Sequence, residues 1–104
     1  MSEIRDPAII ALLAEARVQF ARSIPAKVAD LRSLLERGAW DDLRRAAHKL
    51  RGSTGTYGFM ELSTAAADVE DALIEAGGVP GPDVQQRVAN RVAEATLEAE
   101  RVGK

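Results

Sequence analysis

Apolar residues recur every three or four positions along most of the chain, the spacing of one face of an α-helix. The first helix is expected to begin at Pro7, with Asp6 as its cap. Pro25 interrupts the periodic pattern, and because proline in a helix interior costs about 3 kcal/mol, we expect a break or kink there. The pattern ends at Gly38 and leaves open whether residues 7–38 form two helices or one bent helix. The first apolar run is Ile9, Ile10, Leu12, Leu13, Ala16 and Phe20.

Three further helices are predicted by the same criteria. One spans residues 40–54, with 55–58 as its frayed end and a turn, and the next spans 59–75. A glycine- and proline-rich segment, 77–82, separates it from a last helix over 83–100. The positions expected to face inward on the last two helices are Leu62, Ala66, Val69, Leu73, Val84, Val88, Val92, Ala95 and either Leu97 or Ala99.

These elements predict an all-α protein, an antiparallel four-helix bundle with an additional N-terminal helix or a kinked first helix. A length of 104 residues suits one domain, 1–104, and 46% hydrophobic but only 4% aromatic residues indicate a narrow aliphatic core. Met1 and the complete set of helices favour a free protein over a piece of a larger one.

Composition also limits the function classes. The chain has no cysteine, no apolar leader and no run of about 20 apolar residues, so we expect a cytoplasmic protein without a membrane span. A net charge of −2 argues against a nucleic-acid-binding protein, which would normally carry a basic excess.

The chain's one histidine, His48, lies on the helix predicted over 40–54. Neutral imidazole is a good nucleophile near pH 7. Residues three and four apart share a helix face, which here holds Arg44, His48, Arg51, Gly52 and Gly55, with Arg45 beside it. A glycine in a helix costs about 1 kcal/mol relative to alanine, so Gly52 suggests that a partner must come close to the imidazole. The alternative is a solvated basic face with an ordinary surface histidine.

The run from His48 through Ser53, followed by Gly58, resembles the signature of the histidine-containing phosphotransfer (HPt) domains of phosphorelays. The likeness covers most of residues 7–76. The matching positions downstream are Leu62, Ala66, Val69 and Glu70, and those upstream are Phe20, Ile24, Pro25, Leu31, Leu34, Leu35, Gly38, Ala39 and Trp40.

Two positions depart from the family pattern. Arg51 stands where lysine is commoner, and Ala39 replaces an aspartate cap, so Asp41 and Asp42 are expected to stabilise the start of the helix instead.

The resemblance implies that His48 accepts a phosphoryl group and that Arg51 stabilises its charge. In the chemotaxis-kinase branch of the family, a glutamate at the offset of Glu70 accepts a hydrogen bond from the imidazole. Antiparallel packing of the two helices would bring Glu70 near His48; the alternative is that Glu70 is an exposed polar residue. The residues expected to contact a partner are Arg44, Arg45, Ala47, Gly52, Gly55 and Tyr57.

The implied function is a phosphorelay carrier, which takes a phosphoryl group from a receiver-domain aspartate of a hybrid histidine kinase and passes it to a response-regulator aspartate. The carrier would have no kinase activity and no cofactor of its own, with Mg²⁺ supplied by the receiver domain. We expect a monomer. Two alternatives remain: a helical adaptor without phosphotransfer, and the dimerising core of a histidine kinase, whose motif usually has an acidic residue where this chain has Lys49.

Overall fold

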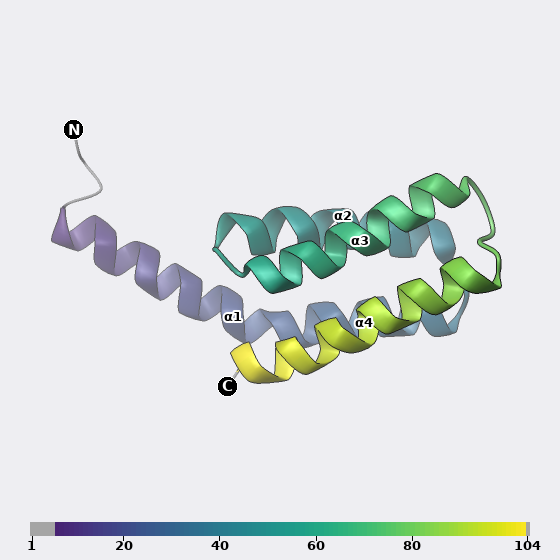
Figure 1. Ribbon diagram of the computed structural model, residues 1–104. Helices are drawn as coiled ribbons and strands as arrows, with labels where there is room; N and C mark the ends of the chain where they lie inside the picture. The colour runs from purple at the N-terminus through teal and green to yellow at the C-terminus, as the bar shows by residue number, and fades with distance from the viewer. Residues whose placement is uncertain (1–5, 104) are drawn as a thin grey trace.

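A computed structural model describes residues 6–103 and contains four α-helices joined by short connections (Figure 1). They are α1 (Pro7–Glu36), α2 (Trp40–Thr56), α3 (Met60–Ala76) and α4 (Pro82–Val102). Short connections make consecutive helices antiparallel. Each helix contacts two others, so that α2 lies between α1 and α3, and α4 lies between α3 and α1. No strand occurs among residues 6–103, and the predicted all-α four-helix bundle is confirmed.

Pro25 does not end the first helix. α1 continues through it as one helix of 30 residues, which decides between the two arrangements that the sequence left open. Ile24 and Val28 flank the proline and are 0% and 1% exposed. Burial of two such side chains contributes about 1.5–3 kcal/mol each, which offsets the roughly 3 kcal/mol cost of an internal proline. Figure 1 shows α1 changing direction as it enters the bundle.

The start of α1 is as predicted, and its N-terminal part projects beyond the other three helices (Figure 1). The Asp6 side chain accepts a hydrogen bond from the backbone N–H of Ala8 at 2.9 Å. Phe20 closes this end of the core, with its ring stacked on Tyr57 at 4.6 Å between centroids. The first apolar run is helical, but the side chains before Phe20 add little to the core: the large apolar ones left exposed here are Ile9, Ile10, Leu12, Leu13 and Val18.

The other boundaries fall within two residues of the predicted ones. α2 extends to Thr56, so Gly55 is helical and the turn begins at Tyr57. α3 ends at Ala76 and is capped by Gly77, whose φ of +69° is a left-handed conformation that glycine adopts without strain. α4 begins one residue earlier than expected because Pro82 occupies its first turn.

The core is built mainly from aliphatic side chains and alanines. Its buried apolar residues are Ile24, Val28, Leu31, Leu43, Ala47, Leu50, Phe59, Leu62, Ala65, Ala66, Val69, Ala72, Leu73, Val88, Val92, Ala95 and Ala99. Of the predicted inward positions, Val84 is only half-buried. The sequence left either Leu97 or Ala99 as an inward position of α4. Ala99 is the inward one, because it is buried whereas Leu97 is 69% exposed.

No helix within residues 6–103 combines the length and the apolar character that a membrane crossing requires.

An ion-pair cluster joins the exposed edges of α3 and α4. Asp68 Oδ1 lies 2.6 Å from Arg87 Nη2, and its Oδ2 lies 2.8 Å from Arg91 Nε. Hydrogen bonds from Arg87 and then Arg91 lower the pKa of Asp68 from 3.8 to about 2. Because this pKa is depressed in the folded state, the pairing stabilises the fold above about pH 4, and the contribution is lost as the pH falls through about 2.

We expect Asp68→Asn to lower the free energy of unfolding by about 1 kcal/mol at pH 7, a value reduced by solvent screening of the two arginines. The difference from wild type should shrink as the pH falls from 5 to 2. Urea unfolding across this range measures it. Glu100→Gln removes an exposed carboxylate outside the cluster and should leave the free energy within about 0.5 kcal/mol of wild type at every pH. A pH-independent loss for Asp68→Asn would contradict the ion-pair explanation.

Candidate functional site

His48 lies on the exposed face of α2 and points its ring toward α3. Its Nδ1 is 2.7 Å from Glu70 Oε2, and the His48 side chain remains 70% exposed. His48 precedes the turn between α2 and α3 while Glu70 follows it, so antiparallel packing places the two residues at the same level of the bundle. The expected approach of the two helices therefore brings these side chains together.

Glu70 is a buried acid, only 6% exposed, which excludes the interpretation that it is an ordinary surface residue. Both of its carboxylate oxygens have partners: Oε2 contacts His48, and Oε1 accepts a hydrogen bond from Arg51 Nη1 at 3.2 Å. A carboxylate can only accept hydrogen bonds, so the imidazole donates from Nδ1. In a neutral ring with a proton on Nδ1, the Nε2 lone pair is free.

Arg51 lies one turn after His48 and bridges two acids of α3. Besides Glu70, its Nη1 contacts Asp71 Oδ1 at 3.4 Å. The sequence predicted Arg51 and Glu70 as site residues, but not Asp71. A sequence signal existed, because Asp71 is the acid directly after Glu70, yet periodicity alone does not say which side chains meet across two helices.

The two glycines of α2 differ in their surroundings. A Cβ added at Gly52 would meet no atom within 4 Å, so the backbone beside His48 is open to an approaching partner. A Cβ added at Gly55 would lie 3.2 Å from Ser63 Oγ of α3. That hydroxyl donates to the Arg51 carbonyl at 2.9 Å. Gly55 thus allows close packing of α2 against α3, a role the sequence analysis did not foresee for Gly55 or for Ser63.

The remaining predicted contact residues make no hydrogen bond or ion pair with His48 within residues 6–103. Ala47 is 0% exposed, which corrects its assignment as a contact residue: its methyl group packs in the core. Arg44 and Arg45 pair with Asp41 at 2.9 Å and 2.8 Å. The Arg44 hydrogen bond and then the charge of Arg45 hold the pKa of Asp41 below 3.8. Tyr57 is half-buried at the end of α2.

The start of α2 agrees with the predicted departure from the usual cap. Ala39 makes no side-chain capping bond, and Asp41 and Asp42 occupy the first turn. Negative charge in the first turn is favourable because the helix dipole is positive there.

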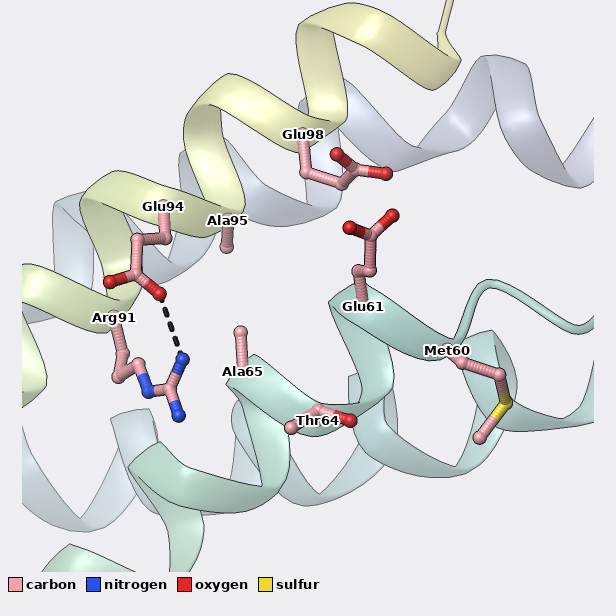
Figure 2. A pocket seen from close by; sticks show the side chains of 8 residues that line it. All are labelled: Met60, Glu61, Thr64, Ala65, Arg91, Glu94, Ala95 and Glu98. Atoms are coloured by element: carbon pink, nitrogen blue, oxygen red, sulfur yellow. Dashed lines mark hydrogen bonds and ion pairs between the residues drawn. The ribbon is translucent and has the colours of Figure 1, made fainter.

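A hollow in the surface of the bundle lies between α3 and α4 (Figure 2). Figure 2 shows Glu61 and Glu98 facing each other across it, and Arg101 pairs with both. Its α3 residues lie on a different face from Glu70, and none of the residues around His48 lines it. Within residues 6–103, no group of three His, Cys, Asp or Glu side chains is placed to hold a metal ion.

A family model, the Hpt domain, matches residues 15–102, most of the chain and all of the site around His48. The chain belongs to the Hpt domain family. Hpt domains are phosphotransfer modules of two-component phosphorelays that interact with receiver domains. Comparisons with curated proteins and with solved structures returned no match. This match confirms the resemblance inferred from the motif. It begins within α1 and does not include residues 7–14 at the start of that helix.

Proposed function

We propose that this chain is a phosphocarrier. In this proposal His48 accepts a phosphoryl group from an aspartyl phosphate on the receiver domain of a hybrid histidine kinase, and then delivers it to the aspartate of a response regulator. The observation that carries the proposal is the contact between His48 Nδ1 and the buried carboxylate of Glu70, on a ring that is otherwise exposed.

The chemical step follows from the orientation of the imidazole. The Nε2 lone pair of His48 forms a bond to phosphorus while the bond from phosphorus to the aspartate oxygen breaks, and the receiver's carboxylate leaves with that electron pair. The phosphorylated ring gains a positive charge, which its hydrogen bond to Glu70 stabilises. Delivery to the second aspartate reverses these bond changes and restores the neutral ring.

The other chemical groups needed for the proposed transfer come partly from this chain and partly from the receiver domain. Arg51 lies one turn from His48 and would stabilise the charge of the bound phosphoryl group. Mg²⁺ and the reacting aspartate would come from the receiver domain. The monomeric state and the cytoplasmic location remain predictions.

The test is incubation of the purified chain with a phosphorylated receiver domain and Mg²⁺. Because the chain contains one histidine, label that is acid-labile and stable in base identifies phosphorylated His48. We expect such label on the wild-type chain and its loss when an unphosphorylated second receiver is added. Absence of label across a panel of competent receivers would overturn the proposal and leave the helical interaction module as the better interpretation.

We expect Gly52→Ala to raise the free energy of unfolding by about 0.5–1 kcal/mol and to slow phosphoryl transfer several-fold. Alanine favours the helix, and its methyl group meets no neighbour within 4 Å, but it would lie beside the imidazole in the path of a receiver domain. Thermal unfolding and transfer kinetics measure the two effects.

Gly55→Ala is the matched control for Gly52→Ala. It makes the same change one turn further along α2, where the new Cβ would press on Ser63 Oγ at 3.2 Å. It should show no gain in stability. An unchanged transfer rate for Gly52→Ala would mean that the receiver domain does not approach His48 across this glycine.

A further inference from the structure

Asp71 contacts Arg51 of the candidate site but has no role in the proposed function. Arg51 Nη1 lies 3.2 Å from Glu70 Oε1 and 3.4 Å from Asp71 Oδ1. Charge-assisted hydrogen bonds usually have lengths of about 2.7–2.9 Å, and Arg91 reaches Asp68 at 2.8 Å. The single Nη1 of Arg51 is therefore shared between two carboxylates and held closely by neither.

The two carboxylates differ in what holds them in place. Glu70 is buried and also bound to His48, whereas the Asp71 side chain is 54% exposed and has no other partner among residues 6–103. The Arg51 side chain is 46% exposed. Exposed pairs of this kind contribute little to stability, so Arg51 can leave Asp71 at little cost.

A phosphoryl group on His48 would change this balance. It would carry between one and two negative charges close to Arg51, as phosphorylated side chains do, and would attract the guanidinium group more strongly than one exposed carboxylate. Asp71 then competes with the phosphoryl group for the same cation.

We propose that Asp71 is a positioning residue that limits how strongly Arg51 stabilises phosphorylated His48, and so favours release of the phosphoryl group to the next receiver domain. The inference rests on the proposed function. A carrier has to give up its phosphoryl group, and full engagement of Arg51 with that group would shift the exchange equilibrium toward the carrier.

The test compares wild type with Asp71→Asn in phosphoryl exchange with one receiver domain at equilibrium. We expect Asp71→Asn to shift the equilibrium toward phosphorylated His48 about threefold to fivefold, the factor that corresponds to loss of one exposed ion pair. The shift should diminish at high salt, because screening weakens the competition. Asp71→Glu, which keeps the charge, should behave like wild type.

Two further variants separate this role from a general effect of charge or folding. Glu75→Gln removes an exposed carboxylate one turn further along α3 and should shift the equilibrium less than twofold. In an Arg51→Ala background, Asp71→Asn should have no effect, because its action passes through Arg51.

The outcomes for the inference and for the proposed function are distinguishable. Wild-type chain that accepts no phosphoryl group overturns the proposed function, and the inference with it. Wild-type chain that is labelled, with Asp71→Asn at the same equilibrium, overturns the inference alone. An equal shift in the presence and absence of Arg51 overturns it as well.

Discussion

Replacement of His48 by glutamine is expected to abolish phosphoryl transfer to this chain while leaving its fold intact. The chain contains no second imidazole, and an amide nitrogen is not nucleophilic. The His48 side chain is 70% exposed, and its one hydrogen bond, to Glu70, can be made by the glutamine N–H₂ group. We therefore expect a change in unfolding free energy below about 0.5 kcal/mol, measured by urea unfolding, together with complete loss of acid-labile label.

Lys49→Gln is the control for this variant. It changes the neighbouring side chain on α2, which is exposed and outside the cluster of His48, Arg51, Glu70 and Asp71. The amount of label on Lys49→Gln should remain within about twofold of wild type, because the change removes one exposed charge outside that cluster. Acid-labile label on His48→Gln at the wild-type level would mean that another group accepts the phosphoryl group, and the assignment of His48 would be wrong.

Leu43→Ala is expected to lower the free energy of unfolding by about 3 kcal/mol, the largest loss of stability among the variants considered. Leu43 is 0% exposed on the core face of α2, where truncation removes buried apolar surface and leaves a cavity. For a domain of this size, such a loss corresponds to a fall of roughly 15 °C in the melting temperature. Calorimetry or thermal circular dichroism measures it.

Leu97→Ala provides the comparison within the same fold. Leu97 is 69% exposed on α4, so the same truncation should change stability by less than about 0.5 kcal/mol. If both leucine variants lost similar stability, the placement of Leu43 in the core and Leu97 on the surface would be wrong. Because none of the hydrogen bonds around His48 involves Leu43, a folded Leu43→Ala chain at low temperature should still be labelled.

Local sequence rules predicted the helices well and failed where packing outweighed them. Caps and periodicity placed the start of α1 at Pro7 and the start of α2 at Trp40. Of the two outcomes left open at Pro25, a break or a kink, the break does not occur, because burial of the side chains on either side of it keeps α1 continuous. The predicted fraying from Gly55 was wrong for a similar reason, since close packing against α3 keeps that turn helical.

The candidate site, like the helices, was predicted from the sequence only in part. The motif singled out His48, Arg51 and Glu70, and in the structure these three side chains lie in one cluster. Ala47 was misassigned as a contact residue, since helix spacing places it on the same face of α2 as Leu43 and Leu50, and that face is buried in the core. Asp71 was missed because its contact with Arg51 depends on the separation and rotation of two helices, which hydrophobic spacing does not specify.

The helical class, the approximate boundaries of the helices and the single histidine follow from the order of the residues alone, because caps, turns and hydrophobic periodicity are local properties. Three features required the packed bundle: Pro25 stays within one helix, Glu70 is buried against His48, and Arg51 is shared between Glu70 and Asp71. These features depend on contacts between residues far apart in the chain. Packing of the helices brings those residues together, and the free energy of burial then overrides local preferences.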